Sequence, residues 1–301
     1  MKTVIVGVGL IGGCMAIDLR NAGLATEVTG VDQNDANAQR AVELGLVDRS
    51  TSLDKALEDA ELVLLAIPVN ALAALLPRIL DGINDRATVI DAGSTKASIC
   101  RAVASHARRE CFVAAHPIAG TENSGPDAAF SGLFRDKTNI ICEKEKSSPV
   151  ALAVAEKVFD ALGMSTIFMD AEEHDKHVAY VSHLSHVSSF LLGKTVLDIE
   201  KDEKNIFALA GSGFASTVRL AKSSPDMWGP IFEQNLEYLS QALQEYIMHL
   251  QKFHYHLLKR DTTELNKIMS GANEIRRVLE GIELKQRNGR KASTEIKQTN
   301  L

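Results

Sequence analysis

The sequence predicts an α/β protein in which a doubly wound parallel sheet is followed by an all-helical C-terminal domain. Short apolar runs rich in β-branched residues alternate with helix-like segments up to about residue 170, which is typical of buried parallel strands joined by crossover helices. Residues 172–200 and 230–285 lack strand-like runs, and their apolar residues recur every three or four positions. This change of pattern predicts one domain at residues 1–170 and a second at residues 171–285.

The elements of the first domain follow from hydrophobic periodicity and turn residues. The predicted strands are Thr3–Val8, Glu27–Asp32, Leu62–Pro68, Thr88–Gly93, Cys111–His116, Asn139–Glu143 and Thr166–Asp170. The predicted helices are Ile11–Ala22, Ala36–Leu44, Leu53–Asp59, Ala71–Leu80, Lys96–Arg108 and Val150–Leu162. Because strands and helices alternate in repeated units, the expected sheet is doubly wound.

The second domain contains an amphipathic pattern that predicts a long helix. Its apolar positions are Leu236, Leu239, Leu243, Tyr246, Ile247 and Leu250, continued by Phe253, Leu257 and Leu258. Such a helix is too long to be covered by one small domain, so we expect a dimerisation domain that is completed by the same domain of a second subunit in a homodimer. Residues 286–301 are polar and are expected to form a flexible tail.

Bulk composition indicates a globular protein without a nucleic-acid or membrane partner. Of the 301 residues, 45% are apolar and 24% are charged, and the formal net charge of −6 offers no basic surface. No apolar stretch approaches the length that spans a bilayer, and the chain starts with Met-Lys and a short strand rather than a leader peptide. The scattered cysteines are interpreted as small reduced thiols, which favours a cytoplasmic location; they are Cys14, Cys100, Cys111 and Cys142.

A glycine-rich segment, Gly7-Val8-Gly9-Leu10-Ile11-Gly12, follows the first predicted strand and opens a helix. The first glycine allows a tight turn, the second lets the backbone approach a pyrophosphate, and the third lets the helix pack on the strand. Free N–H groups and the dipole at the helix N-terminus favour the negative charge. The segment therefore predicts a Rossmann-type dinucleotide site that includes Gly7, Gly9, Leu10, Ile11 and Gly12.

Asp32 ends the second predicted strand, 20 positions after Gly12, which is the expected spacing for a carboxylate that binds the ribose hydroxyls. A carboxylate there repels a 2′-phosphate, and the next residues are Gln33 and Asn34 rather than arginine. We therefore expect NAD rather than NADP as the cofactor. Arg40 is the basic residue that could modify this preference, but it lies a turn or two into the next helix.

Two further strand ends are expected to line the cofactor. Ile67 and Pro68 end one of these strands, and Ser94 follows the other. Ser94 could cap a helix N-terminus. It could also place its hydroxyl between the cofactor and a catalytic group, and the two roles are compatible.

His116 is the strongest catalytic candidate, because it ends a strand-like run and begins the segment His-Pro-Ile-Ala-Gly-Thr-Glu. Ligands of parallel α/β sheets bind at the carboxyl ends of the strands. An imidazole there can take or give a proton near neutral pH. Oxidation of an alcohol removes a hydride and a proton, so it requires a hydride acceptor and a proton acceptor side by side.

The second domain offers further polar residues whose interpretation stays open. His174 with His177, and His183 with His186, are each one helical turn apart, but no HExxH motif and no cysteine or glutamate at ligand spacing supports a metal site, so none is predicted. Ordinary histidines on a helix surface are favoured, with a substrate-facing helix as the alternative. Arg219 follows a run of glycines and small residues, and it could hold a carboxylate through two parallel hydrogen bonds or lie on the surface.

Together these motifs resemble the prephenate dehydrogenase family. The matching segments are Gly7–Gly13, Asp91–Lys96, His116–Glu122, His174–His186 and Gly211–Trp228. The resemblance implies oxidative decarboxylation of prephenate to 4-hydroxyphenylpyruvate with NAD, a reaction of tyrosine biosynthesis.

The resemblance also implies roles for individual residues. His116 corresponds to the catalytic histidine that takes the proton of the ring 4-hydroxyl, and Ser94 corresponds to the serine that orients this histidine. Arg219 corresponds to the arginine that binds a substrate carboxylate. The residues that correspond to the substrate pocket are Glu122, Ser182 and His186.

Three alternatives follow from the same sequence. An arogenate or dual-specificity cyclohexadienyl dehydrogenase differs only in a few pocket residues. A β-hydroxyacid dehydrogenase needs a lysine base in the helical domain, for which Lys176 and Lys194 are candidates by position only. A catalytically silent NAD-binding regulator would lack the base or the carboxylate clamp, and both are present here.

Overall fold

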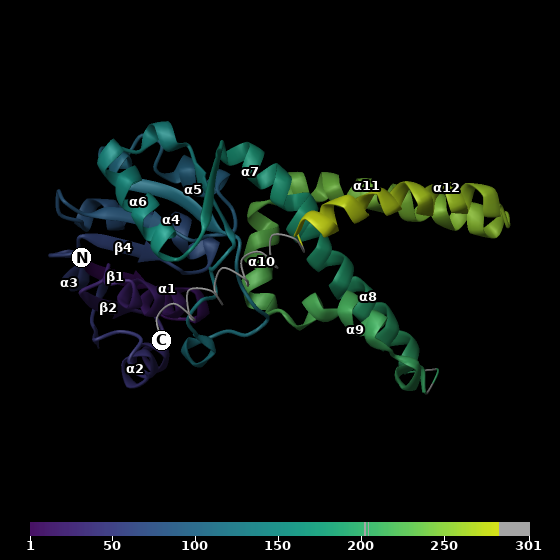
Figure 1. The fold of residues 1–301 in the computed structure, drawn as a ribbon, viewed down its shortest axis with the longest axis horizontal. Helices are drawn as coiled ribbons and strands as arrows, with labels where there is room; N and C mark the ends of the chain where they lie inside the picture. The colour runs from purple at the N-terminus through teal and green to yellow at the C-terminus, as the bar shows by residue number, and fades with distance from the viewer. Residues whose placement is uncertain (202, 204, 283–301) are drawn as a thin grey trace, which may run out of the picture. The chain divides into compact units, whose positions relative to one another are not determined.

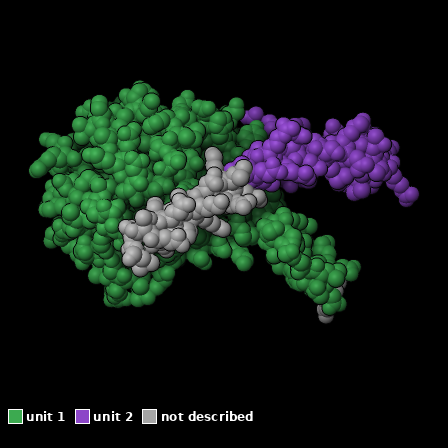
Figure 2. Space-filling model, in the orientation of Figure 1, with its two compact units in different colours: residues 1–239 green, residues 240–301 purple. Residues whose placement is uncertain are grey.

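The computed structural model describes residues 1–201, 203 and 205–282, and its internal contacts divide the chain into two compact units, Met1–Leu239 and Ser240–Leu301 (Figure 2). The polar tail predicted at residues 286–301 lies outside the described residues. The strands all lie within residues 1–170 in the part of the chain that the structure describes. The domain boundary at residue 170 stays a prediction.

An eight-stranded sheet forms the centre of the first unit, in the order β3-β2-β1-β4-β5-β6-β7-β8. Figure 1 labels three of its strands, β1, β2 and β4. The strands are β1 Lys2–Val6, β2 Glu27–Val31, β3 Arg49–Ser50, β4 Leu62–Leu65, β5 Thr88–Asp91, β6 Phe112–Pro117, β7 Thr138–Cys142 and β8 Ser165–Met169. The order from β3 to β6 is that of a doubly wound dinucleotide-binding sheet, whose direction of winding reverses between β1 and β4. The predicted α/β fold is confirmed.

Helices cover both faces of this sheet. They are α1 Leu10–Asn21, α2 Asp35–Glu43, α3 Leu53–Leu57, α4 Val69–Gly82, α5 Ala97–Ala102 and α6 Pro149–Ala161. Apolar residues of α1 and α6 pack on one face, and those of α3, α4 and α5 pack on the other. Each fully buried Leu, Ile or Phe contributes about 1.5–3 kcal/mol relative to an exposed side chain. These two apolar layers hold the strand ends that carry the candidate site.

Two details of the sheet differ from the prediction. β3 was not predicted because it has only two residues, both exposed. β7 runs antiparallel to β6, with Ala114 opposite Cys142 and Pro117 opposite Asn139. A parallel pair needs a crossover of a dozen or more residues, usually a helix, whereas residues 118–137 contain only the 3-10 turn Pro126–Ala128.

The rest of the described chain is helical, as predicted. Its main helices are α7 Ala171–Val178, α8 Leu184–Glu200, α9 Ser212–Thr217, α10 Pro225–Gln234, α11 Leu236–Leu258 and α12 Thr262–Ala272. The π-helical turn Ala179–His183 joins α7 to α8, and such turns often occur at functional sites. Arg219–Lys222 and Asn273–Ile275 are 3-10 turns. None of the helices in the described part of the chain has the length and apolar character needed to span a lipid bilayer.

Candidate active site

The glycine-rich turn after β1 has the close contacts that require glycine. Gly7 has φ +92°, and a Cβ atom there would lie 2.4 Å from the carbonyl oxygen of Ala66. A Cβ at Gly12 would lie 2.1 Å from the carbonyl oxygen of Gly7. At Gly9, by contrast, the nearest atom to such a Cβ is the backbone nitrogen of Gly125, at 4.0 Å. The backbone at Gly9 therefore has open space beside it, as the approach of a pyrophosphate requires.

Asp32 follows β2, and its carboxylate is held at the end of the neighbouring β1. Oδ2 accepts a hydrogen bond from the N–H of Val8 (3.1 Å), and Oδ1 accepts one from the N–H of Asn34 (2.9 Å). A carboxylate can accept about four hydrogen bonds, so acceptor capacity remains for ribose hydroxyls. The guanidinium of Arg40 is already paired, through Nη2 to Oδ1 of Asp127 (2.7 Å) and through Nη1 to Glu43 (3.2 Å).

The structure brings Ile67 to the same turn. A Cβ atom added to Gly7 would lie 2.8 Å from Cγ2 of Ile67, so the segments that follow β1 and β4 contact each other here. Pro68 is exposed and immediately precedes α4. Leu10 and Ile11 open α1, with Leu10 buried and Ile11 packed against the core.

His116 lies near the end of β6, where this strand leaves β5. β6 pairs with β5 only at Phe112 and Val113 and then pairs with β7. At Ala115, side chains replace the missing strand partner: the N–H donates to Oδ1 of Asp91 (3.0 Å), and the carbonyl accepts from Nζ of Lys96 (2.6 Å). Lys96 and Asp91 also form an ion pair in which both side chains are 0% exposed. A buried charged pair thus fixes the backbone next to His116.

The ring of His116 is hydrogen-bonded on one side only. Its Nδ1 lies 2.8 Å from Nε2 of His174, whose Nδ1 lies 2.7 Å from Oδ1 of Asp175. His116 is half-buried, and within the described residues its Nε2 has no hydrogen-bond partner. Burial, followed by the charges of His174 and Lys96, holds the pKa of His116 well below its ordinary value. The ring is therefore neutral at neutral pH and can accept a proton at Nε2.

Ser94 lies in the turn between β5 and α5 and is half-buried. It does not cap α5, because the helix begins at Ala97 and Lys96 is the residue before it. The prediction that Ser94 could cap this helix was therefore wrong. The first N–H groups are satisfied by Asp175 instead: Oδ1 accepts from Lys96 (2.7 Å), and Oδ2 accepts from Ala97 (2.9 Å).

His186 and Arg219 are brought together. The ring of His186 on α8 stacks on Trp228, with ring centroids 3.5 Å apart, and its Nδ1 donates to the carbonyl of Ser182 (2.9 Å). Burial is the main cause of the lowered pKa of His186, and the positive charge of the exposed Arg219 lowers it further. Ser189 holds the Arg219 turn on α8, since its hydroxyl donates to the carbonyl of Thr217 (3.1 Å) and accepts from the N–H of Ala221 (3.1 Å).

Within the described residues, the Glu122 side chain makes no contact with His186 or Arg219. It lies exposed on the loop that follows β6 and makes no hydrogen bond within the described part of the chain. The Ser182 side chain is half-buried, and only its backbone carbonyl takes part in the contacts described here.

His183 lies between the His174–Asp175 pair and the His186–Trp228 stack. It is 1% exposed, and burial lowers its pKa to about 4. Its ring packs edge-on against Trp228, and its Nδ1 accepts a hydrogen bond from the side-chain amide of Asn235 (3.0 Å), which also donates to the backbone carbonyl of Asp175 (2.7 Å). The expectation of ordinary surface histidines was therefore wrong for His174 and His183, whereas His177 is exposed.

Sequence reasoning missed His174 and Asp175 as parts of the site, although a signal was present. Together with Ala171 and Val178 they occupy positions i, i+3, i+4 and i+7 of α7, which is the spacing of a buried helix face. Within the described residues, no group of His, Cys, Asp or Glu is arranged to hold a metal ion.

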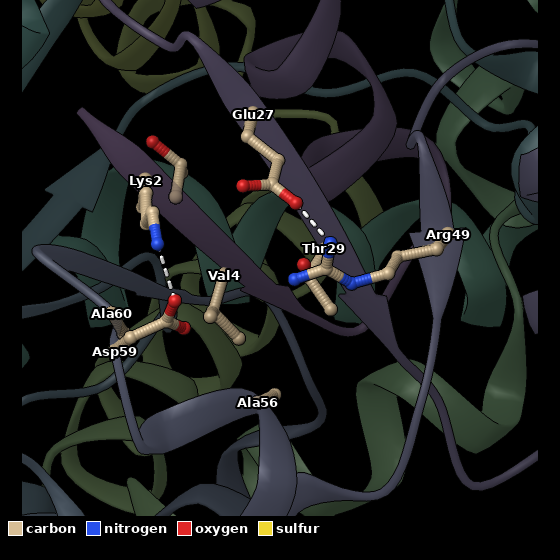
Figure 3. A pocket seen from close by; sticks show the side chains of 9 residues that line it. Lys2, Val4, Glu27, Thr29, Arg49, Ala56, Asp59 and Ala60 are labelled. Atoms are coloured by element: carbon tan, nitrogen blue, oxygen red, sulfur yellow. Dashed lines mark hydrogen bonds and ion pairs between the residues drawn. The ribbon is translucent and has the colours of Figure 1, made fainter.

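A hollow at the amino ends of β1 and β2 is not a candidate active site (Figure 3). Its charged side chains are already paired, Lys2 with Asp59 at 2.5 Å and Arg49 with Glu27. Lys2 and Glu27 begin their strands, whereas the glycine turn and Asp32 follow the other ends of the same strands. The hollow therefore lies at the edge of the sheet opposite the candidate site.

A dinucleotide-type glycine turn and a neutral imidazole, both at carboxyl ends of strands in one doubly wound sheet, define a Rossmann-type dehydrogenase. The chain belongs to the prephenate dehydrogenase family. Residues 15–168 match the model of its nucleotide-binding domain, and residues 170–271 match the model of its dimerization domain.

Three relatives illustrate the similarity. The cyclohexadienyl dehydrogenase of Zymomonas mobilis is 30% identical over 85% of this chain and 88% of its own length. The crystal structure of prephenate dehydrogenase from A. aeolicus in complex with hydroxyphenyl propionate and NAD+ is 30% identical, has a TM-score of 0.84, and covers 93% of this chain and 98% of its own. Synechocystis arogenate dehydrogenase is 27% identical, has a TM-score of 0.73, and covers 93% of this chain and 100% of its own.

Proposed function

We propose that this chain catalyses the NAD-dependent oxidative decarboxylation of prephenate to 4-hydroxyphenylpyruvate. The observation that carries the proposal is the ring of His116, neutral and with Nε2 free of any described partner. The similarity to the A. aeolicus prephenate dehydrogenase, whose structure was determined with NAD+ and hydroxyphenyl propionate, supports NAD as the cofactor and a substrate with a six-membered ring and a carboxylate.

The residues present fit a dinucleotide. Open space beside Gly9 admits the pyrophosphate next to the N-terminus of α1, and Asp32 retains acceptor capacity for ribose hydroxyls. When bound, NAD supplies the hydride acceptor. The preference for NAD over NADP rests on the Asp32 carboxylate, which repels a 2′-phosphate, and on the existing pairing of Arg40 with Asp127 and Glu43.

His116 acts as the general base in this proposal. As hydride leaves C4 of the substrate ring, the 4-hydroxyl becomes a carbonyl, and its proton moves to Nε2 of His116. The ring carboxylate then leaves as carbon dioxide, and the electrons of the broken bond move through the ring to the 4-oxygen and complete the aromatic ring. The phenolate oxygen takes a proton back to give the 4-hydroxyl of the product, and the loss of carbon dioxide makes the reaction irreversible. We assign Ser94, half-buried in the turn after β5, to orienting His116 once cofactor and substrate are bound; within the described residues it makes no hydrogen bond to the ring.

The substrate carboxylate is bound by Arg219. The guanidinium is exposed, and its turn is held on α8 by Ser189. A planar guanidinium binds a carboxylate through two parallel hydrogen bonds, which fixes the ligand's direction as well as its distance. His186 lies close enough to Arg219 for its pKa to respond to the arginine's charge, and we assign His186, Ser182 and Glu122 to the same pocket.

A dual-specificity cyclohexadienyl dehydrogenase is the second candidate, favoured by the identity with the Zymomonas mobilis enzyme. Arogenate carries an ammonium group where prephenate carries a keto group, so acidic or neutral groups near that position decide the preference. Steady-state assays with both substrates, each with NAD and NADP, separate the candidates. Turnover of prephenate with NAD at a far higher kcat/KM than the other three combinations supports the proposal, and the absence of turnover with prephenate contradicts it.

The dimerisation domain and the location complete the proposal. We propose a domain boundary at residue 170, with residues 171–285 as the dimerisation part of a homodimer. The family-model matches at 15–168 and 170–271 support this division. The cytoplasmic location is supported by the four free cysteines, because thiols stay reduced in that compartment. Light scattering of the purified protein measures the subunit number.

A further inference from the structure

Three side chains form a hydrogen-bonded series behind the catalytic face of His116. Nδ1 of His116 meets Nε2 of His174 at 2.8 Å, and Nδ1 of His174 meets Oδ1 of Asp175 at 2.7 Å. His174 and Asp175 are 0% and 1% exposed. Because each histidine ring nitrogen is either a donor or an acceptor, the direction of every bond in this series can be worked out from its end.

The end of the series is the Asp175 carboxylate, which acts as an acceptor. Its two oxygens accept the backbone N–H groups of Lys96 and Ala97, which open α5. A carboxylate that accepts two N–H groups in this way also offers an acceptor oxygen to His174. An ionised Asp175 requires His174 to donate from Nδ1, and burial keeps His174 neutral by lowering its pKa. A neutral ring with its proton on Nδ1 has an unprotonated Nε2, which accepts.

His116 must then donate from Nδ1 to His174. A neutral His116 with its proton on Nδ1 carries its lone pair on Nε2, the nitrogen without a described partner. The other tautomer would direct a lone pair of His116 against a lone pair of His174 across 2.8 Å and would leave no lone pair on the substrate side. The arrangement of the buried side chains therefore selects the tautomer that can act as a base.

The series is rigidly anchored. The amide of Asn235 donates to the backbone carbonyl of Asp175 (2.7 Å) and to Nδ1 of His183 (3.0 Å), which joins α7 to the end of α10. The charged or titratable groups that act on His116 are His174 from α7, Lys96 from the turn before α5 and His183 from the π-helical turn. His174 alone among them bonds directly to the His116 ring.

We propose that His174, held by Asp175, is a positioning residue that keeps His116 in the Nδ1–H tautomer, so that Nε2 is the base. The consequence for turnover rests on the proposed function, but the tautomer itself does not. His174 touches neither substrate nor cofactor in this role and acts only through His116. In serine proteases an aspartate fixes the tautomer of the catalytic histidine in a comparable way.

The first test measures the tautomer in the intact, ligand-free protein. The ¹⁵N chemical shifts of histidine-labelled protein at neutral pH, assigned with His116→Asn, distinguish a protonated from an unprotonated ring nitrogen. We expect Nδ1 of His116 to be protonated and Nε2 to be unprotonated. The reverse assignment in the wild-type protein overturns the proposal without any need for a variant at His174.

The second test uses two substitutions at His174 and one control. His174→Phe removes the acceptor and is expected to lower kcat by about 10–100-fold with KM unchanged, because part of the His116 population takes the wrong tautomer. His174→Gln keeps a side-chain carbonyl acceptor and is expected to restore most of kcat. The control is His177→Phe, one turn further along α7 and exposed, for which kcat and the His116 shifts should not change.

The outcomes separate this inference from the proposed function. Wild-type kcat and unchanged His116 shifts in His174→Phe overturn the positioning role. Equal loss of kcat in the Phe and Gln variants also overturns it, because the acceptor would then be irrelevant. A third outcome is a protein that shows the predicted ¹⁵N chemical shifts of His116 but turns over neither prephenate nor arogenate. This outcome supports the tautomer assignment and contradicts only the proposed function.

Discussion

Replacing Lys96 by methionine tests the claim that a buried ion pair holds the backbone beside His116. Lys96 and Asp91 are both 0% exposed, so Lys96→Met leaves the Asp91 carboxylate buried without its cation. The carboxylate keeps the N–H donors of Ala115 (3.0 Å) and Gly93 (2.9 Å), and the carbonyl of Ala115 loses its Nζ donor. Removing one partner of a buried pair costs about 3–5 kcal/mol of unfolding free energy.

The matched control is Lys2→Met. Lys2 also pairs with an aspartate, Asp59 (Figure 3). The two side chains are 50% and 56% exposed. An exposed pair of this kind contributes little to stability, because water and salt screen its two charges. Both variants carry the same chemical change, so the difference between them isolates the effect of burial.

The assay is urea unfolding followed by the fluorescence of Trp228, the single tryptophan of the chain, which lies in the first compact unit. We expect Lys96→Met to lower the unfolding free energy by several times the loss in Lys2→Met, and Asp91→Asn added to Lys96→Met to recover part of it. Equal losses in Lys96→Met and Lys2→Met would refute the reasoning, as would a larger loss in the double variant.

Three further predictions concern the cofactor, the substrate and the pH dependence of stability. Asp32→Ala is expected to weaken NAD binding by about 10–100-fold in a fluorescence titration, because hydrogen bonds to a charged group contribute about 1.5–3 kcal/mol; unchanged NAD affinity would remove Asp32 from the site. Arg219→Ala is expected to raise KM by about 10–100-fold and to raise the pKa of His186, measured by NMR titration, because a nearby positive charge is lost; a fall in that pKa contradicts the placement. Folding lowers the pKa of His183 from 6.5 to about 4, so between these pH values His183 is protonated only in the unfolded chain. About 3 kcal/mol of unfolding free energy that is present above pH 6.5 is therefore lost as the pH falls from 6.5 to about 4. Urea unfolding at pH 7 and pH 5 should show about 2 kcal/mol of this loss in the wild-type protein, because pH 5 lies within the window, and a smaller loss in His183→Asn.

The parts of the site that were predictable are those whose signals are local in the sequence. Gly7, Gly9 and Gly12 follow a strand and open a helix, and Asp32 ends the next strand, so spacing alone identifies the dinucleotide-type turn. His116 was identifiable for a similar reason, because an apolar run places it at a strand end. The same reasoning could have found the antiparallel β7, since no helix-like segment separates it from β6.

The support of His116 was not predicted because it joins distant parts of the chain. His116 and His174 are 58 positions apart, and Lys96 and Asp175 are 79 apart. The polar segment around His174 was interpreted as a solvent-exposed helix face, although His174 and Asp175 share the buried face with Ala171 and Val178. Lys96 was predicted as an ordinary first residue of a helix, since its burial depends on Asp91 and on the divergence of β6 from β5.

The central claim is that a neutral His116 is the base, and the pH profile of kcat/KM tests it most directly. This profile reports the pKa of the essential base in the free enzyme. Because the pKa of His116 is held well below 6.5, the predicted profile stays level as pH falls through 6.5 and declines only at clearly lower pH, with the decline abolished in His116→Asn along with most of the activity. An acid limb centred at or above pH 6.5, or a His116→Asn enzyme with wild-type turnover, would contradict the account.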